Sequence, residues 1–378
     1  MTTKLLCVAG ARPNFPKIAP LMHALQGNPR FVTKLIHTGQ HYDDALSKIF
    51  FDELNIPRPD LDLEVGSASH AVQTAELLKR FEQVLKDEQP QAVLVVGDVN
   101  STVACALASA KFFLDAPFTF RGVERQRPVM IHVEAGLRSF DDDMPEEINR
   151  RVTDNISEML FVTDPAGEEN LKNEGVDAER VNFVGNVMID TLLAAKEKAM
   201  ASDVLTRLKL EEGAFALLTL HRPSNVDDPA TLREILGALD EIAKDVPIVF
   251  PMHPRTKPRI ADTNMELDPT RWITCPPMGY LDFLKLEATA KLVLTDSGGI
   301  QEETTVLGVP CLTLRENTER PVTITEGTNV LARTKRETIL AAYAQVKAES
   351  PAGRIPRYWD GHAAERIVKA MEEAFGPK

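Results

Sequence analysis

Residues 291–303 of this chain read Lys-Leu-Val-Leu-Thr-Asp-Ser-Gly-Gly-Ile-Gln-Glu-Glu, and this stretch indicates the fold. It begins as a short apolar run of strand type, turns at a glycine pair, and continues with residues that suit a helix. Backbone N–H groups at such a turn, formed by Ser297, Gly298 and Gly299, can hold a phosphate. A carboxylate on the opening helix, such as Glu303, can accept hydrogen bonds from ribose hydroxyls. The glycine pair alone is equally compatible with an ordinary turn.

The same strand-to-helix alternation extends along most of the chain. It predicts strands over 5–9, 32–37, 92–96, 129–133 and 159–163, then over 215–220, 247–251, 272–275, 291–295 and 309–314. Amphipathic patterns between them predict helices over 70–86, 102–113, 229–244, 280–288 and 335–348. Alternating strands and helices favour parallel sheets covered by helices on both faces.

The alternation runs twice, with a polar, charged stretch at 194–212 near the changeover. We therefore expect an α/β fold of two Rossmann-like domains that face a central cleft. The expected borders are 1–185 and 186–361, with a last helix within 362–378 joining the first domain. In open α/β sheets the ligand lies at the C-terminal ends of the strands, so the loops that follow strands hold the candidate residues.

Composition narrows the class of protein. The chain has 378 residues, 43% hydrophobic and 26% charged, with a formal net charge of −13, which argues against nucleic acid or an anionic membrane as a partner. No apolar stretch approaches the ~20 residues of a membrane helix, and the N-terminal run is too short for a signal peptide. The four cysteines, Cys7, Cys105, Cys275 and Cys311, are far apart in apolar runs, which favours buried free thiols in the cytoplasm over disulfides or a metal site.

The first candidate loop is Gly10-Ala-Arg-Pro-Asn-Phe-Pro-Lys17, directly after the first predicted strand. A helix is expected to begin near Pro16, because proline suits the first helical turn. Arg12 and Lys17 would then lie near a helix N-terminus, where anions bind. A plain turn with solvated charges is the alternative. The loop lacks the G-x-G-x-x-G pattern, so a nicotinamide cofactor is not indicated.

Three carboxylates follow strands in the first half. Asp98 lies in Gly97-Asp-Val-Asn-Ser-Thr102, where it would serve catalysis or cap a helix. Glu134 ends the strand His132-Val-Glu134. Glu146 follows Pro145, which we expect to open a helix capped by one of residues 141–143, with Arg150 one turn further on. Crowded carboxylates shift one another's pKa, so such a site can hold both an acid and a base.

Positive groups follow strands in the second half. His221 lies in Leu220-His-Arg-Pro-Ser-Asn225, His253 in Pro251-Met-His-Pro-Arg255, and Arg320 in Thr318-Glu-Arg-Pro321. With Arg12, His221 and Arg320 would form the local cluster that an acidic protein needs to hold a diphosphate.

Taken together, the ordered set GARPNFPK, TGQH, GDVNST, HVEAGLRS, MPEEINR, LHRPSN, PMHPR, TDSGGIQEE and TERP closely resembles the non-hydrolysing UDP-N-acetylglucosamine 2-epimerases. The resemblance runs from the first strand to about Arg320. It implies a GT-B fold, a homodimer and no metal or redox cofactor. It also implies reversible C2 epimerisation of a UDP-sugar by anti elimination of UDP, which leaves a 2-acetamidoglucal, and re-addition of UDP.

The resemblance also implies residue roles. Asp98, Glu134 and Glu146 match the catalytic carboxylates, and Arg12 and His221 match residues that hold the diphosphate and help UDP to leave. Further matched substrate-binding positions are Lys17, Arg138, Arg150, His253, Ser297, Gly298, Gly299, Glu303 and Arg320.

Three other functions stay open: epimerisation of a modified sugar such as a diacetamido uronic acid, a hydrolysing epimerase, and a GT-B glycosyltransferase. The loop Arg12-Pro13-Asn14 disfavours the hydrolysing class, which typically has Arg-Ala-Asp or Arg-Ala-Glu there. Two departures from the family pattern are informative. After Gln40-His41 this chain has Tyr42 and Asp43, where relatives activated by UDP-GlcNAc continue with arginine. Before Gln73 it has Val72, where those relatives also tend to carry arginine. We therefore expect either no activation by that sugar or a differently decorated substrate.

Overall fold

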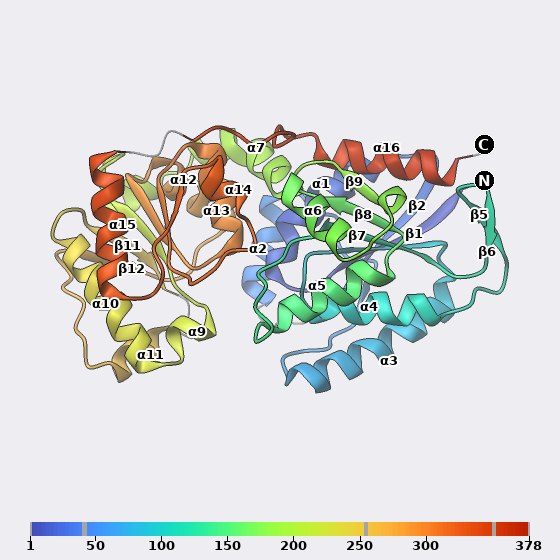
Figure 1. The fold of residues 1–378 in the computed structure, drawn as a ribbon, viewed down its shortest axis with the longest axis horizontal. Helices are drawn as coiled ribbons and strands as arrows, with labels where there is room; N and C mark the ends of the chain where they lie inside the picture. The colour runs from blue at the N-terminus through green and yellow to red at the C-terminus, as the bar shows by residue number, and fades with distance from the viewer. Residues whose placement is uncertain (1, 40–43, 253–255, 350–352, 377–378) are drawn as a thin grey trace. The chain divides into compact units, whose positions relative to one another are not determined.

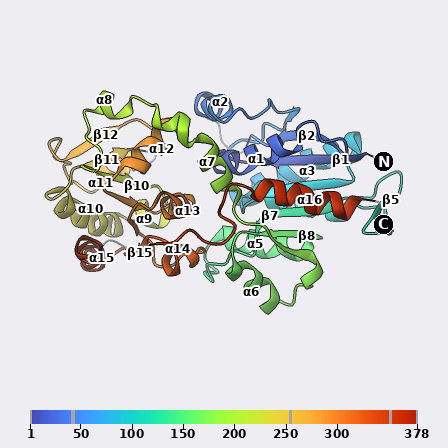
Figure 2. The same ribbon diagram turned by 90° about the horizontal axis from the view of Figure 1, so that it is seen from above.

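The computed structural model describes residues 2–39, 44–252, 256–349 and 353–376, and only the backbone at Arg12 and residues 44–48. Contacts divide the chain into two compact units (Figures 1 and 2). The first comprises Met1–Thr191 with Arg357–Lys378, and the second Leu192–Pro356. From the sequence we placed these borders at 185/186 and 361/362.

The first unit is built on a seven-stranded parallel sheet in the order β3-β2-β1-β4-β7-β8-β9. The strands are β1 Thr3–Ala9, β2 Phe31–His37, β3 Leu61–Asp62, β4 Ala92–Val96, β7 Val129–Ala135, β8 Met159–Val162 and β9 Val181–Phe183. The main helices are α1 Phe15–Leu25, α2 Asp44–Glu53, α3 His70–Glu88, α4 Asn100–Lys111, α5 Pro145–Ile156, α6 Pro165–Asn173 and α16 Ala363–Phe375. Helix α7 Val187–Met200 begins in this unit and continues into the second. In Figure 1, α1 and α16 lie on one face of the sheet, and α3, α4 and α5 lie on the other.

The second unit contains a six-stranded parallel sheet in the order β12-β11-β10-β13-β14-β15. Its strands are β10 Ala216–Thr219, β11 Ile248–Pro251, β12 Trp272–Cys275, β13 Leu292–Thr295, β14 Cys311–Thr313 and β15 Asn329–Leu331. Its helices are α8 Val204–Leu208, α9 Pro223–Val226, α10 Pro229–Ala243, α11 Thr256–Asp262, α12 Tyr280–Thr289, α13 Gly298–Leu307, α14 Val322–Thr325 and α15 Arg336–Ala348.

Both faces of the second sheet are buried, which explains its continuous apolar strands. Leu292 and Leu294 pack with α10 and α15 on one face, whereas Val293 packs with α12 and α13 on the other. Side chains alternate across a strand, so a strand covered on both sides reads as an unbroken apolar run.

The last helix returns to the first unit. The Asp190 carboxylate accepts hydrogen bonds from the backbone N–H groups of Ala363 and Ala364, at 3.1 and 2.7 Å, and so caps the N-terminus of α16. Just before the helix, the indole N–H of Trp359 donates to the Thr163 carbonyl at 2.9 Å. These contacts join segments about 170 to 200 residues apart, a range at which local sequence patterns carry little information.

The structure adds elements that the sequence patterns did not predict. These are the short strands β3, β9 and β15, and a hairpin of β5 Phe118–Phe120 and β6 Val123–Arg125. Each has two or three residues, too few for an alternating pattern to show. The stretch 194–212, interpreted as a polar changeover, contains the end of α7 and all of α8. Among the described residues no helix is long and apolar enough to cross a membrane.

Candidate active site

The loop after β1 is held in place by one amide side chain. Asn14 Oδ1 accepts hydrogen bonds from the backbone N–H groups of Gly10 and Ala11, at 3.1 and 3.0 Å, and its Nδ2 donates to the Val96 carbonyl at 3.1 Å. The loop is therefore tied to the C-terminal end of β4. Arg12 opens a short 3₁₀ turn here, and its side chain lies outside the described atoms. The helix that follows begins at Phe15 with proline in its first turn, as expected.

Lys17 and Glu134 form a buried ion pair. They are 8% and 3% exposed, on the first turn of α1 and at the end of β7 respectively. Glu134 has φ of 71°, in the left-handed region that a glutamate rarely adopts, and the pairing of β7 with β8 is irregular at this point. Such strain is typical of functional sites, where the surroundings hold a side chain in one orientation.

Gly97 lies directly against this ion pair. Its φ is +66°, and a Cβ there would lie 3.0 Å from Lys17 Nζ and 3.2 Å from Glu134 Oε2. A side chain at this position would be strained and would press on the pair. The loops after β1, β4 and β7 thus meet at one edge of the sheet.

Asp98 is held by Arg150. The guanidinium Nε of Arg150 donates to Asp98 Oδ2 at 2.9 Å, and Asn149 Nδ2 donates to the Asp98 carbonyl at 2.9 Å. The Asp98 side chain is 27% exposed, so a ligand can reach its carboxylate. The alternative role of helix cap does not apply, because the residue at the N-cap of α4 is Val99.

Of the two glutamates that open α5, Glu147 organises the loop and Glu146 is accessible. Glu147 is 0% exposed and accepts from the Ser139 backbone and hydroxyl and from the Phe140 backbone. Glu146 is half-buried, and within the described part of the chain no hydrogen bond or ion pair engages its carboxylate. That arrangement leaves Glu146 available to a ligand.

One local expectation for α5 was wrong. The residue at its N-cap is Met144, with no side-chain hydrogen bond, so none of the three preceding aspartates caps the helix. Arg150 pairs with Glu147, three residues before it, and not with Glu146. Glu147 and Arg150 are both buried, and a buried charge is costly without a counter-charge, so Glu147 rather than the half-buried Glu146 takes the ion pair.

Arg138 is also better described as a structural brace than as a substrate ligand. Its side chain is 0% exposed and pairs with Asp154 at 2.8 Å and Glu174 at 2.7 Å. Asp154 in turn contacts His132 Nδ1 at 2.7 Å, and His132 Nε2 contacts the Gly97 carbonyl at 2.8 Å. Burial favours the neutral acid, but His132 and Arg138 outweigh it and hold the pKa of Asp154 below its usual value. This buried chain supports the loops that carry Asp98 and Glu134.

In the second unit, Asp296 orients His221. Asp296 is 0% exposed, and its carboxylate accepts from the backbone N–H groups of His221 and Arg222, at 2.9 and 2.8 Å. Oδ1 of Asp296 lies 3.0 Å from His221 Nδ1, while the His221 side chain is 47% exposed. A carboxylate at Nδ1 favours the proton there and leaves Nε2 directed at a ligand. Burial raises and His221 lowers the pKa of Asp296, with a net value below the usual one.

The glycine turn before α13 lies against Arg320. Ser297 occupies the N-cap position, and a Cβ on Gly298 would lie 2.5 Å from the NH1 atom of Arg320. Only glycine lets the guanidinium approach the helix N-terminus so closely. The N-terminal N–H groups and this cation together make the turn suited to an anion.

Arg320 belongs to a buried charge network. Its Nε donates to Glu302 Oε1 at 2.7 Å, and Glu319 contacts Arg315 at 2.7 Å and Arg222 at 3.3 Å. Burial alone would raise the pKa of Glu319, but Arg315 and Arg320 hold it well below the usual value. Arg315 and Glu319 were not identified from the sequence, although both lie within the five residues that precede Arg320.

Glu303 lies on the second turn of α13 rather than the first. It is 2% exposed, and its Oε1 accepts a hydrogen bond from the Tyr280 hydroxyl at 2.7 Å. Burial of the carboxyl group raises the pKa of Glu303.

Two sets of predicted residues lie outside the described structure: His253, and the loop residues Gln40, His41, Tyr42 and Asp43. The neighbouring Gln73 is described. It is 4% exposed, donates to the Gly66 carbonyl at 2.8 Å and accepts from Asn100 at 2.8 Å.

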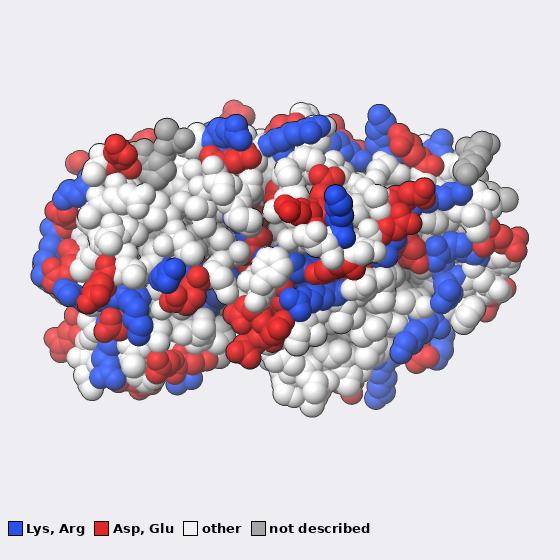
Figure 3. Space-filling view, viewed as in Figure 1, with Lys and Arg blue, Asp and Glu red and all other residues white. Residues whose placement is uncertain are grey.

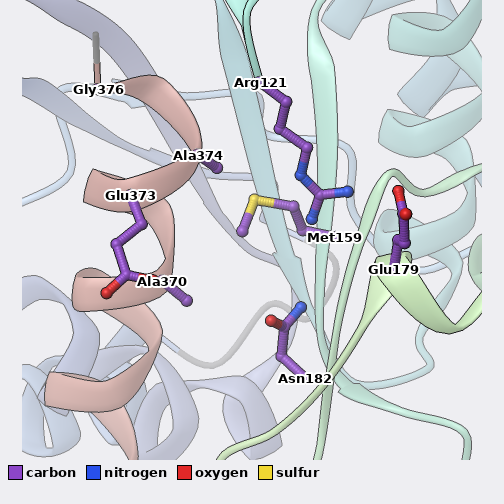
Figure 4. Close-up of a pocket in the computed structure, with 8 residues that line it drawn as sticks. All are labelled: Arg121, Met159, Glu179, Asn182, Ala370, Glu373, Ala374 and Gly376. Atoms are coloured by element: carbon purple, nitrogen blue, oxygen red, sulfur yellow. The ribbon is translucent and has the colours of Figure 1, made fainter. Parts of the chain in front are cut away.

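A surface pocket of about 400 Å³ in the first unit lies away from these loops (Figure 4). Met159 at the start of β8 and Asn182 of β9 line it from the sheet side, and Glu373 of α16 lines it from the opposite side. Because the candidate residues of this unit follow the C-terminal ends of strands, a pocket at the start of β8 is not their site.

Comparisons with known proteins agree with this arrangement. A UDP-N-acetylglucosamine 2-epimerase homolog of Methanococcus maripaludis is 41% identical over 375 residues, which are 97% of this chain and 99% of the relative. The UDP-2,3-diacetamido-2,3-dideoxy-D-glucuronate 2-epimerase of Pseudomonas aeruginosa is 38% identical over 371 residues, with the same coverages of 97% and 99%.

The fold is shared with a solved structure. That structure, Methanocaldococcus jannaschii UDP-GlcNAc 2-epimerase in complex with UDP-GlcNAc and UDP, superposes with a TM-score of 0.89 at 38% identity and covers 98% of this chain and 99% of that one. The expected α/β fold of two Rossmann-like, GT-B-type domains is confirmed. The sequence model of the family described as UDP-N-acetylglucosamine 2-epimerase matches residues 23–372. With relatives of this identity aligned over nearly its whole length, the chain belongs to the UDP-N-acetylglucosamine 2-epimerase family.

Proposed function

We propose that this enzyme interconverts UDP-N-acetylglucosamine and UDP-N-acetylmannosamine by inverting C2 of the sugar. The observation that carries the proposal is the set of carboxylates Asp98, Glu134 and Glu146, which lie after β4, at the C-terminal end of β7 and on the first turn of α5. Two of them are oriented by the cations Arg150 and Lys17. Family membership and the relatives' activities support the same conclusion.

The C2 proton is not acidic enough for direct removal, so the reaction proceeds by elimination. One carboxylate accepts the C2 proton while the bond between C1 and the UDP oxygen breaks, and UDP leaves with the electron pair. The product is a 2-acetamidoglucal with a C1–C2 double bond. In the reverse sense, a UDP oxygen attacks C1 and a carboxylic acid delivers a proton to the other face of C2. A positioned acid or base of this kind contributes ~10²- to 10⁴-fold to the rate.

The two units then have separate roles. The first unit, with Asp98, Glu134 and Glu146, carries the proton transfers. The second unit holds UDP through Ser297, Gly298, Gly299 and Arg320 at the diphosphate and Glu303 at the ribose. His221, oriented by Asp296, stabilises the departing diphosphate. Arg12 is assigned to the diphosphate, and His253 to substrate binding, on the family resemblance alone.

The relative from P. aeruginosa supports a second candidate substrate. This relative is a UDP-2,3-diacetamido-2,3-dideoxy-D-glucuronate 2-epimerase, and its identity to this chain, 38%, is close to the 41% of the M. maripaludis homolog. The two sugars share the acetamido group at C2, so the same elimination serves both. Substituents at C3 and C6 distinguish them.

The experiment that tests the activity follows UDP-GlcNAc in D₂O by proton NMR of the anomeric signals. We expect a UDP-ManNAc signal, retention of UDP on the sugar at equilibrium, and deuterium at C2 of both epimers. Free ManNAc with stoichiometric UDP would place the enzyme with the hydrolysing class. If only the diacetamido uronate turns over in parallel assays, the second candidate substrate is correct.

The same assay tests the activation hypothesis. Val72 is 55% exposed and uncharged at the position where activated relatives carry arginine. We propose that the reverse reaction from pure UDP-ManNAc starts immediately. A long lag that trace UDP-GlcNAc abolishes would contradict this proposal.

We also propose that the enzyme is a homodimer and works in the cytoplasm. Figure 3 shows a broad area without Lys, Arg, Asp or Glu over α4 and part of α3. Val72 on α3 is 55% exposed, and Phe113, two residues after the end of α4, is 66% exposed. Large exposed apolar side chains beside an uncharged surface favour an interaction site. The four free cysteines support a reducing compartment.

The dimer is tested by light scattering. Val72→Glu introduces a charge at a 55% exposed position on α3, the helix that the uncharged area partly covers, and is expected to give monomers. Val123→Glu, at a 64% exposed position on β6, is the matched control and should leave the mass unchanged. A monomeric wild-type protein would rule the dimer out.

A further inference from the structure

Two buried carboxyl groups lie together in the second unit. Glu287 on α12 is 0% exposed, and Glu303 on α13 is 2% exposed. The two helices are in contact and cover the same face of the sheet (Figure 1). A buried carboxylate costs free energy unless its oxygens find hydrogen-bond donors or a counter-charge. The groups around the pair therefore decide its protonation.

Few polar groups face the pair. From α12, the Tyr280 hydroxyl donates to Glu303 at 2.7 Å. From β14, the Cys311 thiol lies near Glu287, and burial raises the pKa of this thiol to about 12, so it stays protonated. Among the described residues neither oxygen of Glu287 has a hydrogen-bond donor, and no ion pair there involves Glu287 or Glu303.

Two ionised carboxylates in this position would be unstable, because both are acceptors and both carry negative charge. Burial and the adjacent Glu303 raise the pKa of Glu287 well above its usual value, and burial raises that of Glu303 as well. Like charges at close range in a dry environment do not both ionise, and one retained proton turns the repulsion into a hydrogen bond.

We propose that Glu287 is a positioning residue that stays protonated and donates a hydrogen bond through that proton to the Glu303 carboxylate. Glu303 is then fixed by two donors, Tyr280 and Glu287. It keeps its negative charge and has lone pairs free for hydroxyl groups. The inference rests on the proposed role of Glu303 in binding the ribose of UDP, and it adds Glu287 as the residue that holds that carboxylate ionised and oriented.

The shared proton makes nucleotide binding depend on pH. When pH rises far enough to remove it, two facing negative charges replace the hydrogen bond, and Glu303 loses its orientation. UDP affinity of the wild-type enzyme should therefore fall on the alkaline side. A glutamine at 287 donates through its amide at every pH, so Glu287→Gln should remove this fall.

The test measures UDP affinity by calorimetry between neutral and alkaline pH in three variants of the full chain. At neutral pH we expect Glu287→Gln to bind as the wild type does and Glu287→Met, which fills the space without a donor, to bind at least about tenfold more weakly. Glu266→Gln, at an exposed position in the same unit, is the matched control and should follow the wild-type pH profile. Equal weakening by Gln and Met, or an identical alkaline fall in wild type and Glu287→Gln, would overturn the proposal.

Infrared difference spectra of the ligand-free protein separate this inference from the proposed function. The wild type minus Glu287→Gln difference should contain the carbonyl band of a protonated carboxylic acid at neutral pH. Its absence would overturn the proposal even if UDP binds normally. If the band is present but no protein binds UDP, the proton sharing stands and the nucleotide role of Glu303 is refuted. Should Glu287→Met fail to fold, the pH profile of Glu287→Gln and the infrared band still test the proposal.

Discussion

The ion pair between Lys17 and Glu134 allows a quantitative test of the site. Their side chains are 10% and 3% exposed, so Lys17→Met leaves the Glu134 carboxylate buried without the positive charge of Lys17. Removing one member of a buried pair costs ~3–5 kcal/mol, whereas an exposed pair contributes ~0–1 kcal/mol. Methionine has a chain of similar length, so packing is retained and the loss is electrostatic. We expect the free energy of unfolding of the first unit to fall by ~3–5 kcal/mol.

The two tryptophans make this measurement specific to one unit. Trp359 is 1% exposed and lies in the first unit, whereas Trp272 lies in the second. In a Trp272→Phe background, urea unfolding followed by fluorescence reports on the first unit alone. The control is Lys4→Met, because Lys4 pairs with Glu88 at 3.2 Å but its side chain is 35% exposed.

A double variant identifies the cause of the loss. Lys17→Met with Glu134→Gln contains neither charge, so it should recover more than half of the stability lost in Lys17→Met. The reasoning is wrong if Lys17→Met costs no more than Lys4→Met. It is also wrong if the double variant stays as unstable as the single one, because the loss would then come from packing.

Three further results are expected. Asp98→Asn should fold normally and lower turnover by at least ~10²-fold in the NMR assay, and near-normal turnover would mean that Asp98 is not an acid or base. Gly298→Ala places a Cβ 2.5 Å from Arg320 and should weaken UDP binding by at least about tenfold, whereas Gly237→Ala, with its nearest atom 3.7 Å away, should not. Burial raises the pKa of Asp190 from 3.8 to about 6, so the folded state holds this proton more tightly than the unfolded state. The contribution of Asp190 to the free energy of unfolding should therefore be largest below pH ~4 and fall by ~3 kcal/mol as pH rises to ~6, so the wild type should lose stability relative to Asp190→Asn over that range in urea titrations.

Local patterns were sufficient for the fold class and for most of the regular elements. The strand predicted over 92–96 coincides with β4, and the helix predicted over 335–348 begins one residue later as α15. Both were visible because the periodicity of a buried strand or an amphipathic helix is contained in a few neighbouring residues. The loops that follow strands were identifiable for the same reason, since in parallel sheets they gather at one edge.

The partner of each charged side chain was decided only by the tertiary structure. Nothing near Asp98 in sequence points to Arg150, which lies 52 residues away, and Asp296 meets His221 from 75 residues away. The family resemblance also placed Arg138 among the substrate-binding positions, whereas in the structure its side chain is buried and pairs with Asp154 and Glu174. A charged side chain has the same appearance in sequence whether it faces a ligand or a buried counter-ion. Its role depends on burial and on the donors around it, which are set when distant segments pack.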